Sequence, residues 1–226
     1  MTVTNNFKRY IKYSSPGINK TENQDNYLIL ETEAFALFAV FDGVGSAQNS
    51  KVGTEIAKTF ISQHFSKFIR ETKVSLNALM FECNNYLIEQ NIPEIYTTYC
   101  TALLHKDHND LFFSSLGDSR IYLVSDQYLE QITTDDKSLL AKNVLTKCLG
   151  MNDLSLKDFT QGNIDLGVDS ILLCTDGFYN LLETDKKKFF ETLNKKNLQS
   201  IYSGLVSLIS NKNVDDSTFI MISQDV

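Results

Sequence analysis

The apolar positions of the chain fall into short runs and into longer stretches with helical spacing, and the two patterns predict different elements. Short runs bounded by polar or glycine-containing segments predict strands over 27–30, 35–41, 97–105, 111–117, 120–124, 128–132, 170–175 and 217–223. Apolar residues three or four positions apart predict helices over 52–68, 75–88, 185–193 and 198–210. A short segment near 7–13 and a turn over 14–17 precede the first strand.

The order of these elements indicates the fold class. Strands and helices come in separate blocks, which favours an α+β arrangement over a parallel sheet with alternating helices. Two stacked sheets with helices on their outer faces would bury the strands on both sides, together with the apolar face of each helix. The 226 residues are enough for one sizeable core, so we expect 1–226 to form a single domain.

Charge and composition narrow the choice of partners. The formal net charge is −7, and the basic clusters Lys186–Lys188 and Lys195–Lys196 lie in a predicted helical segment with acidic neighbours. This pattern is typical of a solvated helix face, so we expect no nucleic-acid partner. No apolar stretch reaches the ~18 residues of a transmembrane helix, so we expect no membrane span. The four cysteines have no CxxC spacing, which indicates reduced thiols and a cytoplasmic protein.

Five aspartates recur at the ends of the predicted strands. A single pair such as Asp42-Gly43 is typical of a tight turn and needs no function. The same position relative to a strand is nevertheless occupied repeatedly, by Asp25, Asp42, Asp118, Asp176 and Asp215. If the strands pack into one core, their ends can converge at one rim and bring these carboxylates together.

Carboxylates that converge in this way repel one another unless a cation compensates them. A ligand set made of oxygen atoms suits Mg²⁺ or Mn²⁺, and none of the three histidines adjoins these aspartates in sequence. Two such ions about 3.5–4 Å apart can activate a water molecule and bind a phosphoryl oxygen. We therefore predict that Asp42 is a metal ligand at the end of a buried strand, and that Gly43 lets the backbone approach the ion.

Seven segments resemble, in order, the motifs of the metal-dependent serine/threonine protein phosphatases (PPM, or type 2C). They are GINKTENQDNYLI (17–29), VFDGVGS (40–46), YTTYCTALL (96–104), LGDSRIYLV (116–124), NVLTKCLG (143–150), ILLCTDGFYNLL (171–182) and DDST (215–218). Each segment alone is weak evidence. Seven of them in the family order, over nearly the whole chain, are specific.

The resemblance implies a fold, a centre and a set of ligands. The fold would be a four-layer α-β-β-α sandwich of two antiparallel sheets, with two Mn²⁺ or Mg²⁺ ions between the sheets. Asp42 would bridge the two ions, the Gly43 carbonyl would bind one of them, and Asp176 and Asp215 would hold one ion. Asp25 would act on the other ion, partly through water.

The chain agrees with the family at one further motif position, and it departs from the family at two others and in the flap. Asp118 corresponds to the aspartate that holds a third, looser ion in bacterial members. Lys20 stands where the family has the arginine that binds the substrate phosphate, so the charge is kept and the bidentate geometry is lost. Gln24 replaces a glutamate that usually orders metal-bound water. Members also carry a helical flap where this chain has only the residues 141–142, so we expect a shortened flap and a more open site.

Two functional hypotheses follow from this resemblance. The first is an enzyme in which metal-activated water directly attacks the phosphate of phosphoserine or phosphothreonine in proteins, without a phosphoenzyme. Its substrate would be a phosphoprotein made by a serine/threonine kinase, and we expect a monomer. The second is a catalytically weakened member that binds phosphoproteins or regulates a partner, as Lys20, Gln24 and the shortened flap would suggest. In either case we expect Ser119 and Arg120 to be structural.

Overall fold

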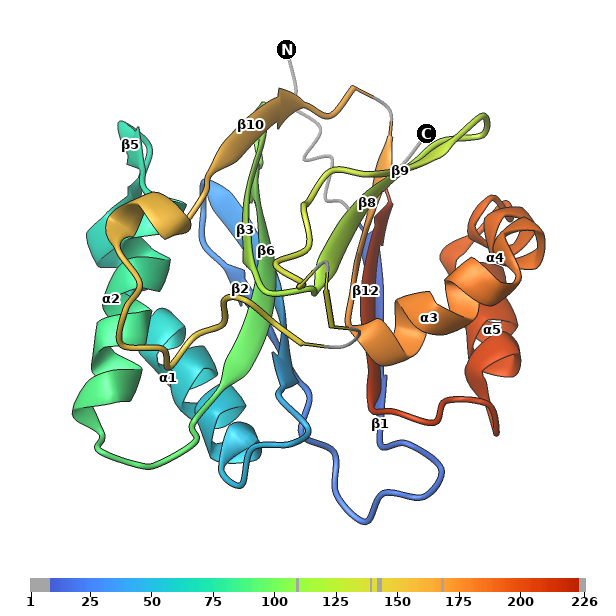
Figure 1. Ribbon diagram of the computed structural model, residues 1–226. Helices are drawn as coiled ribbons and strands as arrows, with labels where there is room; N and C mark the ends of the chain where they lie inside the picture. Colours follow the sequence, from blue (N-terminus) through green and yellow to red (C-terminus); the bar gives the residue numbers. More distant parts are fainter. Residues whose placement is uncertain (1–8, 109, 139, 142–143, 168, 224–226) are drawn as a thin grey trace.

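A computed structural model describes residues 9–108, 110–138, 140–141, 144–167 and 169–223 of the chain. Two five-stranded antiparallel sheets lie face to face, and helices cover both outer faces (Figure 1). We name the sheets after one central strand each. The β12 sheet has the order β1 (Arg9–Ser15), β12 (Ser217–Ser223), β11 (Ser170–Cys174), β8 (Arg120–Val124) and β9 (Leu129–Gln131). The β3 sheet has the order β10 (Gly162–Asp165), β7 (Asp110–Leu116), β6 (Thr97–His105), β3 (Phe35–Gly43) and β2 (Asn26–Glu31).

The helices form one layer on each side of the paired sheets. The helices α1 (Ser50–Phe68) and α2 (Leu76–Glu89) pack on the β3 sheet, at the left of Figure 1. The helices α3 (Asp176–Thr184), α4 (Lys186–Leu193) and α5 (Leu198–Ile209) pack on the β12 sheet, at the right. A small hairpin of β4 (Ile69–Arg70) and β5 (Lys73–Val74) follows α1, and a 3₁₀ turn spans Leu156–Asp158. This confirms the predicted four-layer α+β sandwich.

Three apolar cores hold the layers together, and β3 shows how one strand serves two of them. Its side chains alternate between faces, as the two-residue period of a strand requires. Phe38 and Val40 face the core between the sheets, while Leu37, Ala39 and Phe41 face α1 and α2. All five are at most 2% exposed, which explains why the sequence of β3 is apolar without alternation.

Most predicted elements are confirmed; the differences are one turn boundary and several elements that the sequence did not predict. The strands predicted over 97–105, 120–124 and 217–223 match β6, β8 and β12 to the residue. The turn predicted over 14–17 begins too early, because β1 pairs with β12 as far as Ser15. Residues 7–8 of the predicted first segment lie outside the described residues. The sequence did not predict α3, β10 or the β4–β5 hairpin.

Candidate active site

A pocket of about 500 Å³ lies at the rim of the sandwich where several strands begin or end. Four of the five predicted aspartates line it: Asp42, Asp118, Asp176 and Asp215. The fifth, Asp25, is buried at 8% exposure and accepts a hydrogen bond from Thr175 Oγ1 (2.8 Å), the residue before Asp176. The structure therefore brings all five aspartates to one place.

The end of β3 delivers Asp42 to the pocket. Asp42 pairs with Thr98 of β6, and Thr97 Oγ1 donates a hydrogen bond to the Asp42 carbonyl oxygen (2.9 Å). Gly43 follows at a place with no room for a side chain, since a Cβ there would lie 2.9 Å from the Gln24 carbonyl oxygen. The glycine thus allows the loop before β2 to pack against the end of β3, which holds Asp42 beside that loop.

Asp176 reaches the same pocket as the first residue of α3. Thr175 has an extended backbone at the N-cap position, and the backbone N–H of Asp176 lies 3.5 Å from Asp42 Oδ2. The next residue, Gly177, packs so closely that a Cβ would lie 2.1 Å from the carbonyl oxygen of Asp216. The start of α3 is therefore held between the end of β3 and the segment that enters β12.

Asp25 is the most deeply buried carboxylate of the group. Its Oδ2 accepts the Thr175 hydrogen bond, whereas its Oδ1 is buried without a hydrogen-bond partner among the described residues. Burial, with smaller contributions from the charges of Asp216 and Asp176, raises the pKa of Asp25 to about 8. The unpartnered oxygen and the raised pKa are both compatible with a carboxylate that binds a cation, which would supply the missing partner of Oδ1.

Two neighbouring carboxylates, Asp42 and Asp176, also have raised pKa values. Burial and then the charges of Asp25 and Asp176 raise the pKa of Asp42 well above its usual range. Burial and then the charges of Asp118 and Asp215 raise the pKa of Asp176 to about 6. Such mutual shifts arise where carboxylates share a poorly solvated space, and a divalent cation would reverse them.

The donor set fits Mg²⁺ or Mn²⁺, because it consists of carboxylate and carbonyl oxygens without histidine or cysteine in the described pocket lining. Within the described ranges, no group of three or more Asp, Glu, His or Cys side chains is arranged so that it could hold a metal ion without moving. The side chains instead take partners from the protein. Asp215 contacts Lys20, Asp118 contacts Lys137, and Asp25 contacts a threonine. The chemistry of the donors therefore fits a hard cation, and rotation of these side chains would be needed to surround one.

Lys20, predicted to bind the substrate phosphate, lies against two aspartates. Its Nζ pairs with Asp215 and lies 3.3 Å from Asp216 Oδ2. Burial alone would lower the pKa of Lys20, but the hydrogen bond and charge of Asp215 raise it. Asp216 itself is 2% exposed and accepts backbone N–H groups of Gly17 (3.0 Å) and Gln24 (2.9 Å). It anchors the 17–24 loop, a role that the sequence did not reveal.

Comparison with known proteins identifies the family. A sequence profile described as protein phosphatase 2C matches residues 17–201, which is most of the chain. The chain belongs to the protein phosphatase 2C family. It is therefore a protein phosphatase, and the pocket with the five aspartates is its candidate active site.

Individual relatives of this phosphatase are distant but cover most of its length. A Mycoplasma genitalium protein, to which a protein-phosphatase activity has been ascribed, is 25% identical over 93% of both chains. The serine/threonine phosphatase Stp of Listeria welshimeri is 24% identical, over 76% of this chain and 75% of its own. The crystal structure of serine/threonine phosphatase Stp1 from Staphylococcus aureus superposes with a TM-score of 0.84 at 19% identity, covering 97% of this chain and 96% of that one. At that identity the superposition shows a shared fold.

The phosphatase pocket also contains a lysine that sequence reasoning missed. Lys137 Nζ lies 2.7 Å from Asp118 Oδ2 and 2.8 Å from the hydroxyl of Tyr179, which itself donates to Asp118 Oδ2 (2.9 Å). No local pattern marks Lys137, since it follows two aspartates in a polar segment. The contact depends on how the segment after β9 folds back onto the turn between β7 and β8.

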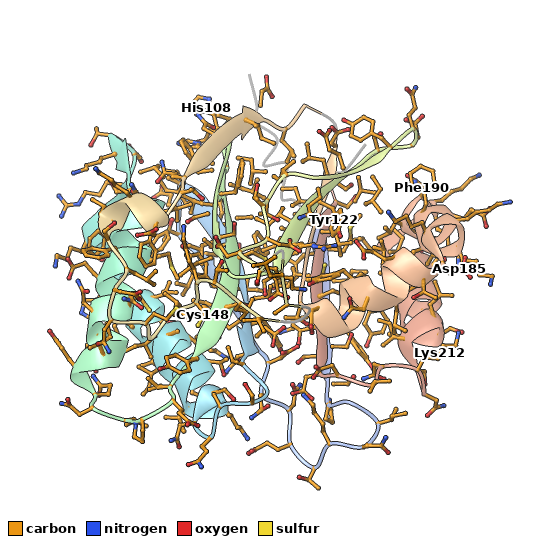
Figure 2. All side chains as sticks on the ribbon, viewed as in Figure 1. His108, Tyr122, Cys148, Asp185, Phe190 and Lys212 are labelled. Carbon is orange, nitrogen blue, oxygen red and sulfur yellow. The ribbon has the colours of Figure 1, made fainter. Side chains whose placement is uncertain are left out.

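Arg120 is structural, as expected from the sequence. Its guanidinium pairs with Asp135 (2.7 Å) and Glu183 (2.6 Å), and donates to the Tyr122 hydroxyl (2.9 Å). Its Cζ also lies 3.7 Å from the centroid of the Tyr179 ring. Tyr122 belongs to the core between the β12 sheet and α3–α5 (Figure 2). Arg120 therefore joins β8, α3 and the segment after β9 behind the pocket.

The structure also bears on the predictions about the cysteines, a membrane span and the segment 141–150. All four cysteines are buried and unpaired. Among the helices of the described ranges, none combines the length and apolar character needed to cross a membrane. The predicted motif over 143–150 and the short 141–142 connection each include a residue outside the described ranges. The described end of that motif pairs with β6, because Thr97 and Leu149 exchange backbone hydrogen bonds of 3.2 and 2.9 Å.

Proposed function

We propose that residues 1–226 act as one metal-dependent domain that hydrolyses phosphoserine and phosphothreonine in proteins. The observation that carries this proposal is the group of five aspartates, four of which line the pocket while Asp25 is hydrogen-bonded to Thr175 beside Asp176. Burial and mutual repulsion raise the pKa values of Asp25, Asp42 and Asp176. Membership of the protein phosphatase 2C family supports the reaction class, and the names of the Listeria and Staphylococcus relatives support serine and threonine as the phosphorylated residues.

We assign two Mn²⁺ or Mg²⁺ ions to this domain. Asp42, Asp176, Asp215, Asp25 and the Gly43 carbonyl would hold them, and Asp118 is the remaining candidate ligand. Bound ions of this kind neutralise phosphoryl oxygens and lower the pKa of water, so that water can attack phosphorus.

The chain's own residues set the geometry for that chemistry. The buried strand β3 fixes Asp42, and the Thr175 hydroxyl orients the Asp25 carboxylate. Lys20 and Lys137 place positive charge beside a pocket that would otherwise repel a phosphate group. No histidine or cysteine lines the pocket in the described part of the chain, which favours direct hydrolysis over a phosphohistidine or phosphocysteine intermediate.

The remaining assignments concern partners and location. The substrate is a protein phosphorylated by a serine/threonine kinase. The phosphatase acts as a monomer. It works in the cytoplasm, where four buried, unpaired cysteines are the expected state.

Phosphate release from phosphothreonine, phosphoserine and phosphotyrosine peptides in the presence of Mn²⁺ tests the proposal. We expect turnover of the first two peptides by the wild type and none by Asp42→Ala, with the cooperative urea unfolding of the wild type retained. A matched control is Asp153→Ala, which removes an exposed aspartate outside the pocket lining and should leave turnover unchanged. Full activity of Asp42→Ala would contradict the mechanism.

The weakened-member hypothesis makes a different prediction in the same assay. A folded, metal-loaded wild type without turnover would favour a phosphoprotein-binding module. The substitutions Lys20→Arg and Gln24→Glu would then restore the family residues, and recovered turnover would locate the defect in those two positions.

A further inference from the structure

The backbone around Lys137 is fixed relative to Asp118. The Asp136 N–H donates to the Gly117 carbonyl oxygen (2.8 Å), and Asp136 Oδ2 accepts the Gly117 N–H (3.0 Å). Lys137 also forms an isolated antiparallel bridge with Leu145. Lys137 follows Asp136, and Asp118 follows Gly117, so this two-way contact sets the two side chains beside each other.

The side chain of Lys137 completes a closed triangle of polar contacts. Its Nζ is 2.7 Å from Asp118 Oδ2 and 2.8 Å from the Tyr179 hydroxyl, and that hydroxyl is 2.9 Å from the same carboxylate oxygen. Tyr179 is 1% exposed and stacks against the Arg120 guanidinium, so its ring cannot swing away. One oxygen of Asp118 therefore accepts a hydrogen bond from Tyr179 and forms an ion pair with Lys137, which carries a full positive charge.

This environment separates Asp118 from the other carboxylates of the pocket. Among the described residues, the hydrogen-bond donors to the Asp25 side chain are threonine hydroxyls, and Asp42 has a backbone N–H at 3.5 Å from its Oδ2. Asp215 also has a lysine partner, and Lys20 is about as exposed as Lys137 (29% and 28%), but the side chain of Asp215 is 49% exposed, so water can replace Lys20 there. The side chain of Asp118 is 7% exposed, and its lysine is held by Tyr179 as well.

We propose that Lys137 replaces a metal ion at Asp118, so that the phosphatase binds two ions and Asp118 is not a ligand of a third. This inference rests on the proposed function, because it presumes that the other aspartates bind two ions. Lys137 is accordingly a positioning residue: its ammonium group holds the Asp118 carboxylate and supplies fixed positive charge to the pocket wall.

The number of bound ions tests the inference without reference to turnover. Free Mn²⁺ is measured by electron paramagnetic resonance during titration of the full chain into the millimolar range. We expect the wild type to saturate with two ions. Lys137→Met keeps the length of the side chain and removes its charge, so this variant should bind a third, weaker ion. The double variant Lys137→Met with Asp118→Asn should return to two.

Lys147→Met is the matched control, since Lys147 lies in the same segment and pairs with Asp136 (3.8 Å) and Asp158 (3.0 Å) outside the pocket lining. It should bind two ions. Three ions on the wild type would overturn the inference while leaving the proposed function intact. Two ions on a Lys137→Met variant that unfolds cooperatively in urea would also overturn it. Fewer than two ions on the wild type would overturn the proposed function and this inference together.

Discussion

Asp25→Asn should stabilise the metal-free phosphatase at neutral pH, which is the opposite of what removal of a structural carboxylate would do. The pKa of Asp25 is raised to about 8, chiefly by burial, so the folded chain holds a proton on this carboxyl at pH 7. The unfolded chain, with an ordinary aspartate pKa of about 3.9, does not. Folding at pH 7 therefore requires proton uptake, and asparagine removes that requirement.

The magnitude follows from the difference between the two pKa values. Each pH unit between about 3.9 and 8 costs about 1.4 kcal/mol of folding free energy, so the cost reaches about 4 kcal/mol at pH 7. It is absent below pH 3.9, grows as pH rises and becomes constant above pH 8. The asparagine amide would be buried without an acceptor at Oδ1, which costs about 1 kcal/mol. The net gain is about 3 kcal/mol at pH 7, and it reverses near pH 4.

Urea unfolding in EDTA at pH 4 and pH 7 measures this gain, and a third series in saturating Mn²⁺ completes the test. In Mn²⁺ at about 100 times the Kd of each site, the wild type should gain about 2.7 kcal/mol for each bound ion, and Asp25→Asn should gain less. Asp153→Asn removes an exposed carboxylate and should change the unfolding free energy by less than about 0.5 kcal/mol. A metal-free Asp25→Asn variant less stable than the wild type at pH 7 would refute the reasoning.

Three further predictions follow from close contacts around the pocket. Gly177→Ala would place a methyl group 2.1 Å from the Asp216 carbonyl oxygen, so calorimetry should show at least a roughly ten-fold loss of Mn²⁺ affinity; unchanged affinity would contradict the packing argument. Arg120→Met leaves Asp135 and Glu183 without their cation and should lower the urea-derived unfolding free energy by about 2 kcal/mol, whereas no loss would show the network to be dispensable. Lys20→Met should raise the KM for a phosphothreonine peptide about ten-fold, and an unchanged KM would exclude a phosphate contact.

The sequence predicted the sheets well because their strands carry strong local signals. β6 is buried over eight consecutive residues, and its sequence TTYCTALLH is rich in β-branched and apolar side chains. The helix α3 was missed because Asp176-Gly177 has the composition of a turn, although Phe178, Leu181 and Leu182 have helical spacing. The start of α3 depends on the packing of Gly177 against Asp216, and a contact between residues so distant in sequence cannot be predicted from a local pattern.

The aspartates of the candidate site were predictable from the strand pattern, Lys20 was predictable only from the family resemblance, and Lys137 was not predicted. Each aspartate adjoins a strand in the sequence, so convergence of strand ends was enough to suggest one cluster. The two lysines reach that cluster from segments with no strand or helix signal of their own, and their partners are distant in sequence. Asp216, likewise, is a buried acceptor for the 17–24 loop, a role that its sequence position does not indicate. Contacts of this kind are set by the fold.

The central claim is that the aspartate cluster binds the divalent ions on which phosphate hydrolysis depends. Hydrolysis of p-nitrophenyl phosphate with and without millimolar Mn²⁺, measured beside Asp176→Asn, tests that claim most directly. We predict turnover by the wild type only with Mn²⁺, and none by Asp176→Asn under either condition. Turnover that does not require Mn²⁺, or that survives in Asp176→Asn, would contradict the account.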